Sequence, residues 1–156
     1  MLNSLTSRQT VWAVFAITLA TIVGAWIFQY AGYPPCELCL KQRWAYYAVV
    51  PLSAIFAVAA SENPKYLRYG LIVLGLIMLA SCIFGIYHSG VEWKFWKGPS
   101  SCTGGGSFKS ALPDLSQPEA MCDQPAIRIF GISLAGYNAL ISGFVSWLSL
   151  YKARAA

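Results

Sequence analysis

The sequence contains few charged residues. Only 11% of its 156 residues are Asp, Glu, Lys or Arg, whereas 57% are hydrophobic, and the mean hydropathy is +0.54. This balance excludes an ordinary soluble domain, so water is not the main solvent of the protein. Charged side chains are absent from four segments, each close to the roughly 20 residues that cross a hydrocarbon core as a helix. These segments are residues 11–31, 44–61, 69–89 and 129–151.

The four segments predict an all-α membrane protein in which four transmembrane helices form a bundle. Residues 1–156 are then a single integral membrane domain with two outer loops, at about 32–43 and 90–128. The second loop is long and rich in Gly and Pro, which predicts flexible coil with at most a short helix near 110–115. Pro51 interrupts the second segment, but a membrane helix tolerates a proline when a neighbour satisfies the freed backbone.

The distribution of Lys and Arg predicts which way the loops face. Four spans put both termini on one side of the membrane, where five Lys and Arg residues lie in short flanking stretches. The six on the other side are spread through longer loops. Because the positive-inside rule weighs short flanks most, the termini are expected in the cytoplasm and the loops outside. Cations that face anionic headgroups also account for the net charge of +5, so it indicates no nucleic-acid partner.

Cysteine is scarce, but four of the five cysteines fall in the outer loops. Cys36 and Cys39 belong to the short loop, and Cys102 and Cys122 to the long one. An oxidising compartment favours disulfides among these four, although spacing alone allows three pairings. The fifth, Cys82, lies inside the third segment, where a buried thiol behaves as a small hydrophobic residue.

Cys36 and Cys39 have the CxxC spacing of redox-active thiols, at the start of the second predicted helix. A helix N-terminus stabilises negative charge, so the thiolate of Cys39 is expected to be favoured and the pair to be reactive. Glu37 stands between the two cysteines, and its negative charge is expected to raise their pKa.

Arg43 follows Cys39 by four residues, so on a helix it stands one turn deeper on the same face. A cation there can polarise a carbonyl group of an electron acceptor that is soluble in lipid, and a quinone is such an acceptor. The sequence has no GxGxxG motif that would indicate a soluble cofactor instead. The alternative is that Arg43 snorkels and anchors the helix. His88, the only histidine, ends the third segment and is either a proton donor beside a quinone or an ordinary interfacial residue.

Cys102 and Cys122 flank a glycine-rich stretch of the long loop. A disulfide between them would close an exposed, flexible loop that a partner protein's thiolate can attack through a mixed disulfide. Two alternatives remain. The bond could be a structural disulfide without a redox role. Alternatively, the four outer cysteines could bind zinc, although four-cysteine zinc sites normally contain a second pair of closely spaced cysteines. We predict no metal site.

Taken together, these motifs resemble the disulfide bond formation protein B (DsbB) family of bacterial inner membranes, and the resemblance covers nearly the whole chain. It is carried by Cys36-Glu37-Leu38-Cys39-Leu40-Lys41-Gln42-Arg43, Gly98-Pro99-Ser100-Ser101-Cys102, Cys122-Asp123 and Gly131-Ile132-Ser133-Leu134-Ala135-Gly136-Tyr137-Asn138.

The resemblance implies a protein-dithiol:quinone oxidoreductase that reoxidises a periplasmic DsbA-like oxidase and passes the electrons to ubiquinone or menaquinone. Cys102 would form the mixed disulfide with that partner, and Cys122 would resolve it. Electrons would then move to Cys36 and to Cys39, which faces the quinone. Arg43 would stabilise the charge that develops on the quinone, and His88 would lie close by. The rival hypothesis is a membrane scaffold with structural disulfides and no redox turnover.

Overall fold

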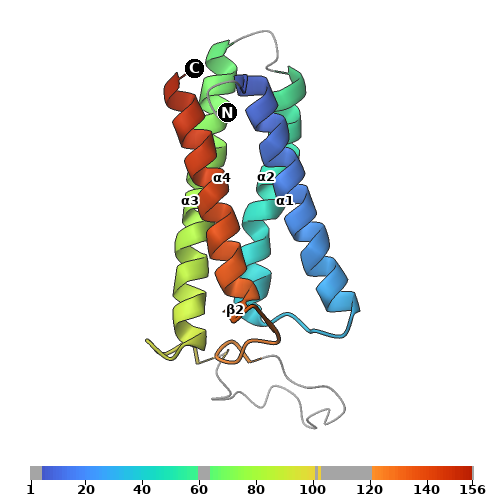
Figure 1. The fold of residues 1–156 in the computed structure, drawn as a ribbon, viewed down its shortest axis with the longest axis vertical. Coiled ribbons are helices and arrows are strands. Elements are labelled where there is room, and N and C mark those ends of the chain that lie inside the picture. Colours follow the sequence, from blue (N-terminus) through green and yellow to red (C-terminus); the bar gives the residue numbers. More distant parts are fainter. Residues whose placement is uncertain (1–4, 60–63, 101, 103–120, 156) are drawn as a thin grey trace.

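The computed structural model describes residues 5–59, 64–100, 102 and 121–155. The coil and short helix predicted near 110–115 lie outside these residues. The described chain forms four long helices and a short hairpin (Figure 1). The elements are α1 (Ser7–Tyr30), α2 (Glu37–Ala59), α3 (Pro64–Glu92), β1 (Arg128–Ile129), β2 (Ile132–Ser133) and α4 (Leu134–Ala155).

The four helices run alongside one another as a bundle, which confirms the predicted fold class. Both termini lie at one end of the bundle, and the hairpin lies at the other (Figure 1). In the described part of the chain, α1 and residues 65–92 of α3 are long and apolar enough to cross a membrane. Large apolar side chains are exposed on all four helices, as expected for a surface that faces lipid. They include Ile27, Ile55, Leu76, Ile83, Leu140 and Phe144.

Helices α3 and α4 pack closely because small residues line their seam. A Cβ atom added to Gly85 would lie 3.0 Å from the backbone of Ala139, and one added to Gly143 would lie 3.1 Å from Cys82 Sγ. The hydroxyl of Ser146 on α4 donates a hydrogen bond of 2.8 Å to the carbonyl of Gly75 on α3. Small residues and interhelical hydrogen bonds of this kind hold membrane helices together.

The observed helix limits differ from the predicted spans at the end of the bundle opposite the termini. Helix α2 begins at Glu37, within the CxxC pair where the second helix was predicted to start, so its first two turns precede the uncharged stretch 44–61. Helix α3 likewise extends to Glu92.

The fourth span was predicted from residue 129, and this start is wrong because residues 128–133 form the hairpin instead. Arg128 pairs with Ser133, and Ile129 with Ile132. Phe130 and Gly131 both have positive φ angles, of 49° and 82°. Positive φ angles at both central residues are typical of two-residue hairpin turns whose twist matches that of the flanking strands.

Candidate functional site

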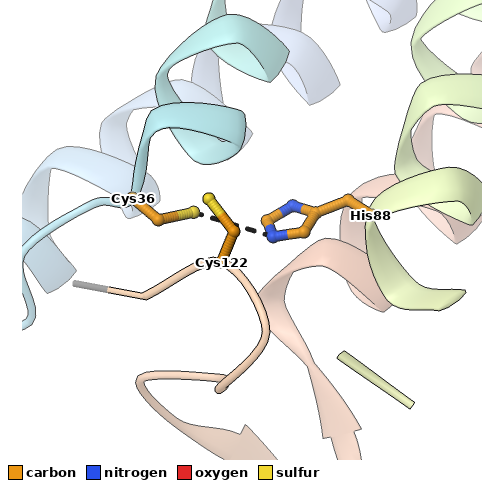
Figure 2. Close-up of side chains that lie close together, drawn as sticks. All are labelled: Cys36, His88 and Cys122. Carbon is orange, nitrogen blue, oxygen red and sulfur yellow. Dashed lines mark hydrogen bonds between the residues drawn. The ribbon is translucent and has the colours of Figure 1, made fainter. Parts of the chain in front are cut away.

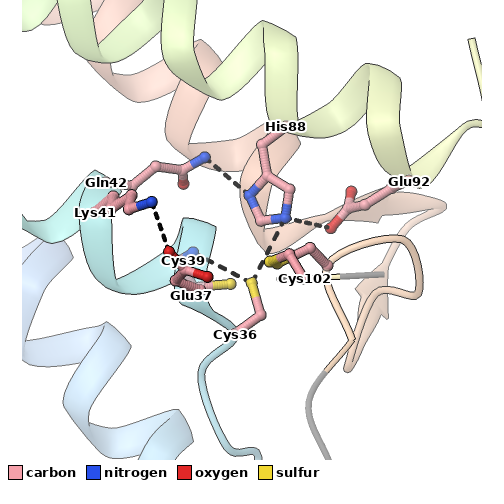
Figure 3. Close-up of a disulfide and its surroundings, with 9 residues drawn as sticks. Cys36, Glu37, Cys39, Lys41, Gln42, His88, Glu92 and Cys102 are labelled. Carbon is pink, nitrogen blue, oxygen red and sulfur yellow. Dashed lines mark hydrogen bonds and ion pairs between the residues drawn. A yellow bond between two sulfur atoms is a disulfide. The ribbon is translucent and has the colours of Figure 1, made fainter. Parts of the chain in front are cut away.

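The four cysteines of the predicted loops gather at the hairpin end of the bundle. Cys36, Cys102 and Cys122 are buried in one cluster, together with Leu38, and Cys39 packs against it. They come from three separate segments of the chain: the start of α2, the stretch after α3, and the stretch before β1 (Figure 2 and Figure 3). The fold therefore brings the predicted sulfur atoms to one place.

Cys36 lies just ahead of α2, and Cys39 lies in its first turn; both are free thiols. The backbone N–H of Cys39 donates to Cys36 Sγ over 3.2 Å. Hydrogen bonds from the Cys39 thiol and then from His88 outweigh the effect of burial and lower the pKa of Cys36 to about 5. The sequence predicted the thiolate at Cys39, whereas the structure favours it at Cys36, because helix-terminus spacing could not reveal the contact with His88.

Glu37 does not oppose this shift. Its carboxylate forms an ion pair of 2.6 Å with Lys41, one turn along α2, and both side chains are largely exposed. An exposed, paired carboxylate is screened by solvent and by its partner. The expected rise is therefore not found at Cys36, whereas the pKa of Cys39 is raised by its hydrogen bond with Cys36 and by burial rather than by Glu37.

His88 is buried, with 1% of its surface exposed, rather than placed at an interface. The Gln42 side-chain nitrogen lies 3.0 Å from His88 Nδ1. An amide nitrogen only donates, so Nδ1 must accept, and the neutral ring then carries its proton on Nε2. Nε2 lies 3.6 Å from Cys36 Sγ and 3.9 Å from Glu92 Oε1 (Figure 3). His88 can therefore donate to a Cys36 thiolate.

Cys102 and Cys122 form a disulfide with Cα atoms 5.3 Å apart. The bond was predicted to be exposed, but Cys102 is 5% exposed and Cys122 is fully buried. The sulfur atoms of Cys36 and Cys122 and a ring nitrogen of His88 lie within 4.8 Å of one another (Figure 2). The disulfide is buried because it packs directly against the CxxC pair.

The same three residues are the group in the described chain that comes closest to a metal-ligand arrangement. The sulfur of Cys122 is bonded to Cys102, however, and zinc binds cysteine as a thiolate. Only two ligands of this group are available while the disulfide is intact.

Contacts around the end of α3 hold the disulfide in place. Lys94 forms an ion pair with Asp123, next to Cys122. The indole N–H of Trp96 donates to the carbonyl of Tyr87 over 2.8 Å, and the two rings stack. The ion pair joins the segment after α3 to the segment of Cys122, and the Trp96 contacts hold the segment after α3 against α3 itself.

A cavity of about 690 Å³ opens beside the thiols, between α1, α2, the end of α3 and the start of α4. Cys36, Cys39, Arg43 and His88 all line it. A largely apolar cavity of this size with a few polar groups is typical of a small-molecule site. The structure thus unites the predicted Arg43 and His88 with the CxxC pair.

Arg43 is fixed by α1. Its guanidinium donates to Gln29 Oε1 over 2.6 Å and to the carbonyl of Ala25 over 3.2 Å. A guanidinium has five N–H donors, so these bonds leave others for a ligand in the cavity. Cys82, in contrast, packs in the α3–α4 seam.

The polar residues of the cavity wall that sequence reasoning missed include Gln42, Tyr46, Glu92 and Asn138. Helical spacing offered a signal for three of them. Gln42 and Tyr46 follow Cys39 by three and seven residues, and Glu92 follows His88 by four, so each shares a helix face with a predicted residue. Asn138 depends on how α4 packs against α2, which no local spacing gives.

Comparison with known proteins supports the site. Residues 7–152 match the family model described as "Disulfide bond formation protein DsbB". The chain is 31% identical to disulfide bond formation protein B 1 of Pseudomonas entomophila, over 86% of this chain and 85% of that one. It is 30% identical to an uncharacterized protein of Rickettsia prowazekii, over 83% and 77% of the two chains. No solved structure gives a significant match. The chain therefore belongs to the DsbB family of disulfide bond formation proteins.

Proposed function

We propose that the protein reoxidises a periplasmic DsbA-like dithiol oxidase and passes the electrons, through its two cysteine pairs, to a membrane quinone. Membership of the DsbB family supports an oxidoreductase role in disulfide bond formation. The observation that carries the finer proposal is the contact between the two pairs. Cys122 of the disulfide lies beside the Cys36 thiol, and that thiol and Cys39 line the cavity.

The first step is exchange with the partner. A thiolate of the reduced partner attacks Cys102 Sγ, and Cys122 leaves as a thiolate. The partner's second thiol then breaks the mixed disulfide, so the partner leaves oxidised and Cys102 and Cys122 are both reduced. Cys102 suits the attacked position because it retains some exposure, whereas Cys122 is fully buried and faces Cys36. The burial of Cys102 means that the partner must displace covering side chains.

The second step moves the electrons between the pairs. The Cys122 thiolate attacks Cys36 of an oxidised Cys36–Cys39 bond, and Cys39 leaves. Cys102 then attacks Cys122, and Cys36 leaves. Thiolates of low pKa leave fastest, so the lowered pKa of Cys36 favours this last exchange. The proposed product of this step has free Cys36 and Cys39 and a bonded Cys102–Cys122 pair, the same bonding as in the structure.

The third step takes place at the cavity. The volume, the largely apolar walls and the few polar groups of the cavity fit a quinone ring with part of its tail. A bound quinone would supply an acceptor for two electrons and two protons. The Cys36–Cys39 pair gives up two electrons as its disulfide re-forms; the Cys39 thiol supplies one proton, and the solvent supplies the second because Cys36 is already a thiolate. Arg43 offers a positive charge one turn from Cys39, where negative charge develops, and His88 Nε2 donates a hydrogen bond to Cys36 Sγ.

The proposed orientation puts the protein in the bacterial inner membrane, with both termini in the cytoplasm and all four cysteines at the periplasmic face. It is supported by the arrangement of the bundle, in which the termini lie at the end opposite the hairpin (Figure 1). It is also supported by the Lys and Arg residues that flank the terminal end.

The test is quinone reduction by the purified protein in detergent, followed by quinone absorbance after a reduced periplasmic dithiol oxidase is added. We expect turnover by the wild type and by Cys82→Ser, whose sulfur lies in the α3–α4 seam, but none by Cys39→Ser. The rival scaffold function draws support from the burial of the Cys102–Cys122 bond. It predicts no quinone reduction by any of the three proteins, and that result would refute the proposal.

A further inference from the structure

The inner wall of the cavity carries a polar group that the reaction above does not use. Asn138 lies in the second turn of α4, is 8% exposed and lines the cavity. Its side-chain oxygen accepts a hydrogen bond of 2.6 Å from the hydroxyl of Tyr46 on α2. Its side-chain nitrogen has no partner among the residues that the structure describes. Asn138 therefore presents two unused N–H donors beside an otherwise largely apolar space.

A buried donor without an acceptor is costly, so a ligand in the cavity is the natural source of the acceptor. We propose that Asn138 is a quinone-binding residue whose amide N–H donates to one carbonyl oxygen of the quinone ring. This inference rests on the proposed function and adds a second point of attachment to it. Tyr46 is a positioning residue, because its hydroxyl holds the amide oxygen and so leaves the amide nitrogen as the unpaired end of the side chain.

Helix geometry places this donor at a useful distance from the thiols. Cys39, Arg43 and Tyr46 follow one another by four and three residues, so they share one face of α2 and all line the cavity. Cys39 and Tyr46 are two turns apart, which is about 10 Å along the helix axis. The two carbonyl groups of a quinone point to opposite sides of its ring. One carbonyl can then lie near Cys39 and Arg43 while the other meets Asn138.

The chemistry of the donor also favours one redox form of the ligand. A quinone carbonyl only accepts hydrogen bonds, which suits an amide N–H. A quinol hydroxyl is a weaker acceptor and brings a hydrogen of its own, which the amide nitrogen cannot accept. Asn138 should therefore bind the oxidised ligand more tightly than the reduced one and assist the release of the product.

The test measures binding apart from turnover. In a Cys39→Ser background, the dissociation constants of a short-chain ubiquinone and its quinol are compared with and without Asn138→Leu. Loss of one hydrogen bond should weaken quinone binding about tenfold, and quinol binding less. Infrared spectra of quinone labelled with carbon-13 at each carbonyl in turn should contain one hydrogen-bonded stretch that the variant loses.

Two further variants make the result decisive. Asn138→Asp keeps the size of the side chain and an acceptor for Tyr46 but removes the donors, so it should also lose the shifted stretch. Ser149→Ala is the matched control, since this buried hydroxyl on α4 donates to Val145 of its own helix and does not line the cavity. Unchanged quinone affinity and carbonyl frequency in both Asn138 variants would overturn the inference. If the wild type still reduces quinone in that case, the proposed function stands without it.

Discussion

The two sides of the bundle are built in different ways. At the α3–α4 seam, Gly85 and Gly143 leave so little room that an added Cβ atom would lie about 3 Å from Ala139 or Cys82. Across the bundle, α1 and α4 both line a cavity of about 690 Å³. On α1, a Cβ added to Gly24 would meet nothing within 4 Å. One side is close-packed, and the other keeps space for a ligand.

The same contrast separates the cysteines. Cys82 lies in the close-packed seam, where its sulfur would be 3.1 Å from a Cβ added to Gly143. Cys36 lies at the open side, within reach of His88 Nε2 and Cys122 Sγ. The two cysteines therefore differ in reactivity, because the sulfur of Cys36 has hydrogen-bond donors and a second sulfur beside it. The reactivity of each cysteine in this protein therefore depends on the residues packed around its sulfur atom.

The largest expected effect breaks the reactive side without touching the seam. Cys102→Ser should reduce turnover with the dithiol partner to background, because it removes the disulfide sulfur that the partner attacks. Quinone should still oxidise the Cys36–Cys39 pair. The free Cys122 thiol would lie beside Cys36, within 4.8 Å in the present structure, with no Cys102 to release it.

Peptide mass spectrometry under non-reducing conditions should therefore detect a Cys36–Cys122 disulfide in Cys102→Ser. Cys82→Ser serves as the control and should keep full turnover. Normal partner turnover by Cys102→Ser would exclude the relay between the two pairs.

The sequence predicted the architecture because membrane helices are encoded locally, in runs without charge. The two pairs of loop cysteines and Arg43 were also visible, since each belongs to a short motif. The burial of the disulfide, the position of the thiolate and the role of Asn138 were not visible. Each depends on a contact between segments far apart in the chain: Cys122 with Cys36, Cys36 with His88, and Asn138 with Tyr46. Local patterns carry no information on such contacts.

A smaller effect is expected when His88 is removed. His88→Ala takes away a hydrogen bond to the Cys36 sulfur, so the pKa of Cys36 should rise from about 5. Below the pKa, each unit of increase reduces the thiolate fraction about tenfold. Alkylation of Cys36 by iodoacetamide at about pH 4, below both pKa values, should therefore slow about tenfold for each unit of increase, whereas the two proteins should converge in alkaline solution. Mass spectrometry separates Cys36 from Cys39, and superimposable pH profiles would contradict the role of His88.

The smallest effect tests the contrast in packing itself, with one substitution made on each side. Gly85→Ala forces a methyl group against the backbone of Ala139, and such overpacking costs typically about 1–3 kcal/mol. Gly24→Ala adds the same methyl group where nothing lies within 4 Å, and it replaces a poor helix former by a good one. Thermal unfolding in detergent should therefore show a lower Tm for Gly85→Ala and an equal or higher Tm for Gly24→Ala. Equal losses in both variants would mean that the two sides are packed alike.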